Sequence, residues 1–152
     1  MEKKKDLSEY DFSAVVANKK VAVIRAEWNP EITEAMEVAC VDTLQKHGVN
    51  NIVCLSVAGS FELPFVAKRA IRLYNVDAVI CIGCIIQGET RHFDFIAQAV
   101  ANGIMQVGLN SEIPVIFGVL TTNTMQQAID RAGGKHGNKG IEAAVACLKL
   151  LE

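Results

Sequence analysis

A histidine follows a glycine turn at the end of an apolar stretch, within the segment Cys81–Phe95. The pattern predicts a buried strand, a turn at Gly88 and a helix whose first turn carries Thr90 and His92. In open parallel sheets, ligands bind at the carboxyl ends of strands, beside the N-termini of the following helices. Because an imidazole titrates near neutral pH, His92 is a candidate proton shuttle. The alternative is a structural or merely exposed histidine.

The ends of three other predicted strands also carry polar or aromatic groups. Trp28, the only tryptophan of the chain, follows the first strand, and the segment 59–62 (Gly-Ser-Phe-Glu) follows the second. Phe117 lies near the fourth, with Arg131 and Lys139 further along the chain. These groups offer aromatic faces, a carboxylate, a hydroxyl and cations. They suit a flat, polar heterocycle together with a small anion.

Each of these features also has a purely structural explanation. Trp28 could pack the corner between a strand and a helix. Glu62 and Asp94 could be acids of a first helical turn that interact with the helix dipole, and Arg131 a cation at a helix C-terminus. The segment 133–140, rich in glycine and lysine, could be a connector or an anion-binding loop. It lacks the spacing of a nucleoside triphosphate loop.

The pair Cys81 and Cys84 has the spacing of a redox or metal-binding motif. However, residues three apart in a strand point to opposite faces, and the chain has no second pair at ligand spacing. We therefore expect no metal site. The five cysteines are expected to be reduced core thiols. His47 and His136 are interpreted as a helix-end cation and a loop residue.

Strand-like apolar runs alternate along the chain with segments of helical period. The predicted helices begin at Asn29–Pro30 with a cap residue and a first-turn proline, near Pro64, near His92, and at Thr124 with a capping box. A last helix follows the glycine-rich loop 133–140. The predicted strands are 20–25, 51–57, 76–84 and 114–120. Such strands form parallel sheets that are covered on both faces. The predicted fold class is α/β: a three-layer α/β/α, flavodoxin-like domain with a four-stranded parallel sheet.

Length and composition fit a single domain, assigned to residues 19–152 of the 152-residue chain. Residues 1–18 form a separate N-terminal segment, in which 10–18 are either disordered or an extra strand that needs a sheet edge. Apolar residues make up 51%, but no apolar run reaches the roughly 20 residues of a membrane span. A net charge of −2 gives no general attraction to nucleic acid or membranes. The N-terminus lacks the features of a secretory signal or transit peptide, so a cytoplasmic location is expected.

Taken together, these motifs resemble the lumazine synthase family. The resemblance runs from about Lys20 to the C-terminus, and five segments in this order are specific. They are Trp28-Asn29, Gly59–Pro64, Gly88–Phe95, Ile113–Thr122, and Gln127–Gly133 with Gly137–Gly140. The resemblance implies condensation of 5-amino-6-(D-ribitylamino)uracil with 3,4-dihydroxy-2-butanone 4-phosphate to 6,7-dimethyl-8-ribityllumazine. Phosphate and water are released, and neither metal nor organic cofactor takes part.

The resemblance also assigns roles to individual residues. Trp28, where the family usually has phenylalanine, would stack on the pyrimidine, and Phe117 would close the pocket. His92 would move protons, Arg131 would clamp phosphate, and Lys139 would be an electrostatic helper. Ribityl contacts would come from Ser60, Phe61 and Glu62, pyrimidine-edge contacts from Cys84, Ile85 and Ile86, and further phosphate contacts from Glu89 and Thr90.

Two residues depart from the family pattern. Gln87 stands where many members carry arginine, and Arg91 stands where a small residue or proline is common. The first change removes a cation and the second supplies one nearby. Phosphate affinity is the property expected to change, because no catalytic group is missing.

The family forms pentamers with active sites between neighbours, and some members build sixty-subunit shells from twelve pentamers. The implied partners are two small-molecule substrates, other copies of the chain, and riboflavin synthase. The short 133–140 linker matches the shell-forming pattern, and the N-terminal segment would add a strand to an adjacent subunit. Three other functions stay open at this point: a flavin- or nucleotide-binding module, a Schiff-base lyase using Lys139, and a structural cage with an inactive site.

Overall fold

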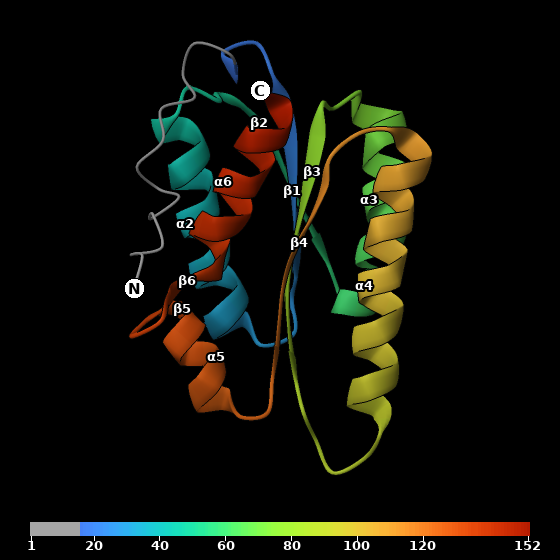
Figure 1. The fold of residues 1–152 in the computed structure, drawn as a ribbon, viewed down its shortest axis with the longest axis vertical. Coiled ribbons are helices and arrows are strands. Elements are labelled where there is room, and N and C mark those ends of the chain that lie inside the picture. The colour runs from blue at the N-terminus through green and yellow to red at the C-terminus, as the bar shows by residue number, and fades with distance from the viewer. Residues whose placement is uncertain (1–15) are drawn as a thin grey trace, which may run out of the picture.

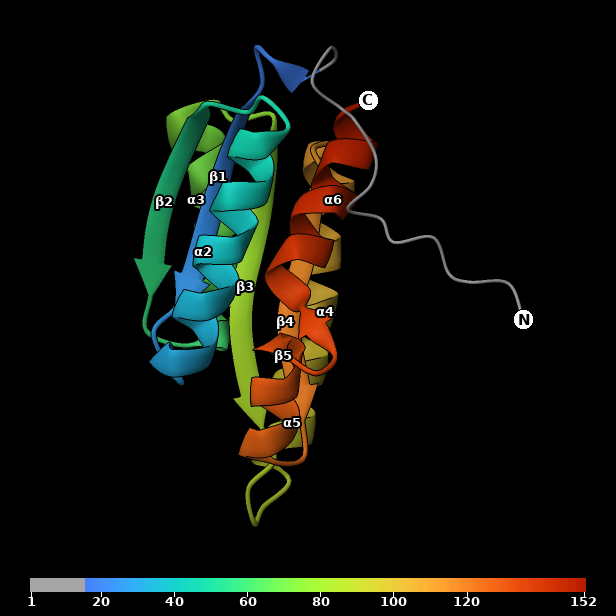
Figure 2. The ribbon, with the colours of Figure 1, turned by 90° about the vertical axis from the view of Figure 1, so that its left-hand side faces the viewer.

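A four-stranded parallel sheet forms the centre of the protein, with strand order β2-β1-β3-β4. The computed structural model describes residues 16–152. The strands are β1 (Lys20–Ala26), β2 (Asn51–Val57), β3 (Ala78–Ile86) and β4 (Val115–Thr122). All four point the same way, so their carboxyl ends meet at one edge of the sheet, at the lower end of Figures 1 and 2.

Helices cover both faces of this sheet (Figure 1). On one face lie α2 (Pro30–Lys46), α5 (Met125–Arg131) and α6 (Lys139–Leu151), and on the other lie α3 (Leu63–Tyr74) and α4 (His92–Ser111). A short 3-10 helix, η2 (Ser60–Glu62), precedes α3. The predicted three-layer α/β/α fold with a four-stranded parallel sheet is confirmed.

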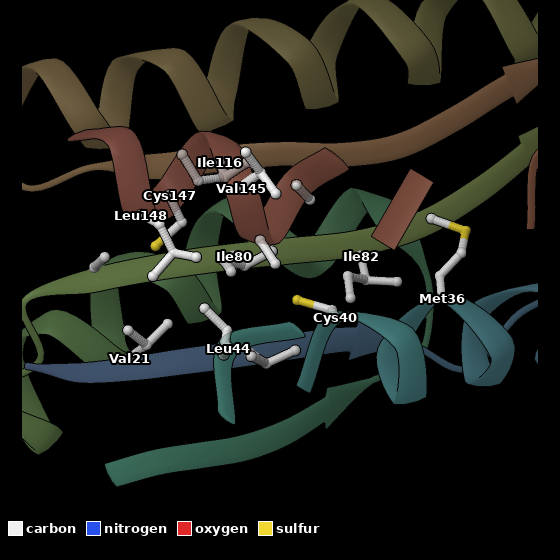
Figure 3. Close-up of a cluster of buried hydrophobic side chains, with 14 of the residues drawn as sticks. Val21, Met36, Cys40, Leu44, Ile80, Ile82, Ile116, Val145, Cys147 and Leu148 are labelled. Carbon is white, nitrogen blue, oxygen red and sulfur yellow. The ribbon is translucent and has the colours of Figure 1, made fainter. Parts of the chain in front are cut away.

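Two apolar clusters, one on each face of the sheet, hold the layers together. The cluster beneath α2 and α6 is shown in Figure 3 and includes Met36, Cys40, Ile80 and Leu148. Burial of such side chains supplies the main driving force for folding. Along β3, residues of opposite parity belong to opposite clusters, which is why the strand is apolar throughout.

The β3 cysteines follow this alternation. Cys81 belongs to the cluster beneath α3 and α4, whereas Cys84 belongs to the cluster beneath α2 and α6. The prediction that they point to opposite faces is confirmed. All five cysteines are free, but Cys54 is exposed on the edge strand β2, so its prediction as a core thiol was wrong. An edge strand is covered by neighbours on fewer sides than a central one.

At two helix starts the hydrogen bonds differ from those that the sequence predicted. Asn29 stands at the N-cap of α2, but its side chain makes no cap bond and donates instead to the Cys84 carbonyl at 3.0 Å. At α5, Thr124 Oγ1 accepts from the Gln127 amide as a capping residue does. The reciprocal bond runs from the amide of Asn123, not Thr124, to Gln127 Oε1 at 2.8 Å.

The glycine-rich segment is a hairpin instead of the predicted loop over 133–140. Strand β5 (Ala132–Gly134) pairs antiparallel with β6 (Gly137–Asn138), and Lys139 and Gly140 already belong to α6. Gly137 takes a φ of 82°, a left-handed conformation that glycine adopts without a steric penalty. The Asn138 side chain caps α6 by accepting from the Gly140 amide at 2.8 Å, so the helix starts earlier than expected.

Within residues 16–152, no helix is both long and apolar enough to cross a bilayer. The predicted extra strand over residues 10–18 falls mostly outside the described residues, so its pairing stays a prediction.

Candidate functional site

A cavity of about 640 Å³ opens at the carboxyl ends of β1, β2 and β3. Its position is the one predicted for a ligand site in an open parallel sheet. The loop that joins β3 to α4 extends beyond the other elements at this end of the molecule (Figures 1 and 2). The cavity is lined by Trp28, Asn29, Ala58, Gly59, Ser60, Phe61, Glu62, Cys84, Ile85, Ile86, Gly88, Thr90, His92, Phe93 and Ile96.

Trp28 presents its indole to the cavity while its backbone is fixed to the neighbouring strand. The Trp28 amide donates to the carbonyl of Ala58 at 3.1 Å, which extends the pairing of β1 with β2 beyond the strand ends. Trp28 is 71% exposed. A Cβ atom at Gly59 would lie 3.2 Å from Trp28 Cδ1, so the indole edge rests against backbone. An open aromatic face on a fixed backbone is suited to stacking on a flat ring.

The segment 60–62 forms the wall beneath this indole as one turn of 3-10 helix. Glu62 Oε2 accepts a hydrogen bond from the Gly59 amide at 3.0 Å, which closes the turn on itself. Glu62 lies in the first turn of η2, as the helix-dipole alternative requires, and it also lines the cavity. Ser60 is buried, whereas the Phe61 side chain is mostly exposed.

Gly83 allows this turn to lie directly on β3. A Cβ atom at position 83 would collide with Ser60 Oγ and approach Leu63 Cδ1 to 3.2 Å. We expect Gly83→Ala to lower the free energy of unfolding by about 1–3 kcal/mol through overpacking, and to displace Ser60. Chemical denaturation measures the first effect. Gly88→Ala is the matched control, because nothing lies within 4 Å of its added methyl group. Equal stabilities for the two variants would contradict the prediction.

His92 and Thr90 enter the cavity from the start of α4. Thr90 Oγ1 accepts from the His92 amide at 3.3 Å, so the hydroxyl is coupled to the first turn of the helix. His92 is exposed to solvent in this chain, which leaves its ring accessible to a bound molecule. Glu89 is also exposed, on the adjoining loop, but it does not line the cavity.

The end of β3 supplies the apolar part of the cavity through Cys84, Ile85 and Ile86. Burial raises the pKa of the Cys84 thiol to about 11, so it stays protonated at neutral pH and acts as a small apolar group. Among residues 16–152, no three His, Cys, Asp or Glu side chains gather as metal ligands.

The buried thiols make stability depend on pH in the alkaline range. Burial raises the pKa of Cys81 from 9.0 to about 12. Between about pH 9 and 11 the unfolded chain loses this proton while the folded chain keeps it, so stability falls as pH rises, by about 1.4 kcal/mol per pH unit for one thiol. We expect Cys81→Ala to flatten the measured slope by that amount. Cys54→Ala, at an exposed position, should change the slope much less; equal slopes in all three proteins would refute the expectation.

Three predicted site residues lie away from this cavity. Phe117 pairs with Cys81 in the middle of β4, far from the strand end at Thr122. Arg131 ends α5, where its Nη1 donates to the Gln127 carbonyl at 3.0 Å, and Lys139 begins α6. The structure thus brings together the predicted pyrimidine and ribityl residues other than Phe117 with Thr90 and His92. It leaves the predicted cations outside the cavity of the same chain.

Six residues that line the cavity had no predicted site role: Asn29, Ala58, Gly59, Gly88, Phe93 and Ile96. Phe93 and Ile96 fall on one apolar face of their helix, and helical period alone does not tell a core position from a cavity wall. The sequence placed Asn29 beside Trp28 after the first strand and interpreted it as a helix cap, but assigned it no contact of its own at the site.

Comparison of the sequence with known proteins identifies the family of the chain. The sequence profile of the family described as 6,7-dimethyl-8-ribityllumazine synthase matches residues 18–152. The chain belongs to this family. It is 50% identical over 149 residues to the 6,7-dimethyl-8-ribityllumazine synthase of Porphyromonas gingivalis, with 95% of this chain and 92% of that protein covered. It is 53% identical over 150 residues to the enzyme of that name from Cytophaga hutchinsonii, with 97% and 94% covered.

The family match covers the whole cavity. The matched region includes every residue that lines the cavity, so the predicted family resemblance is confirmed over the whole site. The sequence profile also spans Phe117, Arg131 and Lys139, which lie outside the cavity of the single chain.

Proposed function

We propose that the protein condenses 5-amino-6-(D-ribitylamino)uracil with 3,4-dihydroxy-2-butanone 4-phosphate to 6,7-dimethyl-8-ribityllumazine, releasing phosphate and water, in the penultimate step of riboflavin biosynthesis. The observation that carries this proposal is a single cavity that contains an open indole, a polar turn and a histidine, in a member of this family. The reaction requires two small molecules to be held together, and proximity alone accounts for much of the rate gain in such reactions.

The pyrimidine substrate would occupy the part of the cavity nearest β1 and β3. Trp28 would stack on its ring, and Cys84, Ile85 and Ile86 would line its edge. The ribityl hydroxyls would bind along the 3-10 helix, at Ser60, Phe61 and Glu62. Because Glu62 Oε2 already accepts from the Gly59 amide, Oε1 is the freer acceptor for a hydroxyl.

The phosphate substrate would bind near the start of α4, where Thr90 offers a hydroxyl and the helix N-terminus favours an anion. Glu89 would contribute its backbone amide. His92 would take up and return protons during imine formation, phosphate elimination and ring closure. The family assigns no metal or organic cofactor to these steps, and none is needed to balance them.

Arg131, Lys139 and Phe117 would reach the cavity from a neighbouring copy of the chain. Their positions outside the cavity support this arrangement, since the family pattern requires them at the site. A pentamer with one site at each boundary satisfies the requirement, and twelve pentamers would form a sixty-subunit shell. The N-terminal segment would extend a neighbour's sheet, and the assembly would associate with riboflavin synthase. We place it in the cytoplasm, with no nucleic-acid or membrane partner.

The direct test supplies both substrates to the purified protein and follows the absorbance and fluorescence of the lumazine. Product must form faster than in the spontaneous reaction of the two substrates without protein. Wild-type protein that gives only the spontaneous rate would exclude the proposal. Native mass spectrometry tests the assembly, and a stable monomer under assay conditions would exclude a site shared between subunits.

A further inference from the structure

We infer that Asn29 is a positioning residue that ties the turn carrying Trp28 to the end of β3, and so sets the width of the pyrimidine-binding part of the cavity. The inference rests on the proposed function for its substrate. The structural contact does not depend on that function. It is one hydrogen bond, which the side-chain Nδ2 of Asn29 donates to the Cys84 carbonyl at 3.0 Å.

The backbone of Asn29 is unusual for a residue that begins a helix. Its φ of 59° and ψ of 57° are left-handed, whereas an N-cap residue ordinarily has an extended conformation. The Asn29 carbonyl still starts α2, because it accepts from the amides of Ile32 at 3.0 Å and Thr33 at 3.1 Å. The side chain makes no cap bond and turns to β3 instead. A favourable local capping bond is thus replaced by a contact across the cavity wall.

The hydrogen bond from Asn29 joins the turn after β1 to β3 at a point where these two strands are no longer paired. Pairing of β1 with β2 continues beyond the strands, because the amide of Trp28 donates to Ala58. Pairing of β1 with β3 ends at Arg25 and Ile82, before β3 reaches Cys84. Beyond that point the strands can separate, since no ladder bond fixes their distance. The side-chain amide of Asn29 supplies a hydrogen bond to β3 where the cavity begins.

This position requires a left-handed backbone and a side-chain hydrogen-bond donor, and asparagine provides both. It tolerates the left-handed region better than most residues that have a side chain, and its amide is a donor that can reach a backbone carbonyl. Aspartate tolerates the same backbone but, when ionised, has only acceptors and would face a carbonyl oxygen. Glycine takes the backbone conformation without strain and offers no donor. These differences allow conformation and hydrogen bond to be tested separately.

The hydrogen bond between Asn29 and Cys84 affects the substrate through the parts of the cavity at its two ends. Trp28 directly precedes Asn29, and its indole is held on one side by Gly59. Cys84 begins the apolar wall formed with Ile85 and Ile86. If the bond to the Cys84 carbonyl is lost, the indole and this wall are no longer held at a fixed separation. The pyrimidine substrate should bind less tightly, whereas the phosphate substrate, which binds at α4, should be little affected.

The experiment compares Asn29→Gly and Asn29→Asp with Asn75→Gly. Asn75 is the matched control because it is also left-handed, with a φ of 50°, but ends α3 outside the cavity. We expect the KM for the pyrimidine to rise about two- to tenfold in Asn29→Gly, which is the effect of one hydrogen bond, with the KM for the phosphate substrate within about twofold. Asn29→Asp should show at least the same increase, and Asn75→Gly none.

Fluorescence supplies a second measurement that needs no turnover. Trp28 is the only tryptophan, so emission anisotropy and acrylamide quenching report on this turn alone. Asn29→Gly should lower the anisotropy and increase quenching, and Asn75→Gly should leave both unchanged. A wild type that forms no lumazine would exclude the proposed function, while these spectra would still test the tie. Unchanged spectra in Asn29→Gly, or equal increases in the KM of both substrates, would overturn the inference.

Discussion

Replacement of His92 by alanine is expected to lower kcat by about 100-fold without abolishing turnover. General acid–base catalysis by one side chain contributes about 10²–10⁴-fold, and the lower end applies because several proton transfers can use water. The remaining activity would come from the cavity, which under the proposed function should still hold both reactants close together. Steady-state lumazine formation gives kcat, and titration with a pyrimidine substrate analogue gives the affinity. That affinity should be unchanged, because the proposed stacking on Trp28 does not involve the imidazole.

The matched control for this variant is His136→Ala. His136 is exposed on the hairpin after α5, does not line the cavity, and uses its backbone amide, at 2.8 Å from the Asp130 carbonyl, to hold the hairpin. Removal of its ring should leave kcat within about twofold. A His92→Ala protein with wild-type turnover would refute the role of His92, and an equal loss in both variants would indicate a general effect on folding.

Mixed assemblies of His92→Ala and Arg131→Ala subunits are expected to regain activity that neither variant has alone. In one chain His92 lines the cavity and Arg131 does not. If each site takes its histidine from one subunit and its arginine from the next, random mixing restores both groups in one half times one half, or about one quarter, of the sites. Co-refolding of equal amounts, followed by the lumazine assay with the phosphate substrate below its KM, measures this fraction. Arg131→Ala alone should mainly raise the KM of the phosphate substrate, since a guanidinium binds phosphate bidentately.

Each variant refolded alone provides the control for the mixture. Both should keep their low activity after the same treatment, and native mass spectrometry should show mixed subunits in the sample with recovered activity. If mixed assemblies form and their activity equals the average of the two variants, the site does not combine residues of two chains. His92 and Arg131 would then have to act within one subunit, through a conformation that differs from the one described.

The elements of the fold could be predicted because their signals are local. The apolar run of β3 and the proline at the start of α2 depend on neighbours within a few residues, and both predictions are confirmed. The hairpin over 132–138 was not predicted. Its glycines indicate a turn of some kind, but pairing of β5 with β6 depends on how α5 and α6 place its two ends.

The candidate site was predictable only in part, for a related reason. Parallel topology guarantees that the ends of β1, β2 and β3 meet, so Trp28, Ser60 and His92 could be assigned to one place. The choice of Asn29 for a bond across the cavity, in preference to a helix cap, could not be foreseen. Both bonds suit an asparagine, and the choice depends on a carbonyl that lies 55 positions away in sequence.

The sequence by itself determined the α/β class, the family and most of the residues at the cavity, because patterns of apolar residues and turn motifs are short-range. Only the tertiary structure decided which of those residues share a cavity. The strand ends already implied that Trp28 and His92 lie together, whereas the tertiary structure placed Phe117, Arg131 and Lys139 outside the cavity of the same chain. The physical reason is that distances between groups far apart in the chain are fixed by packing of helices on the sheet and by single bonds such as that from Asn29 to Cys84.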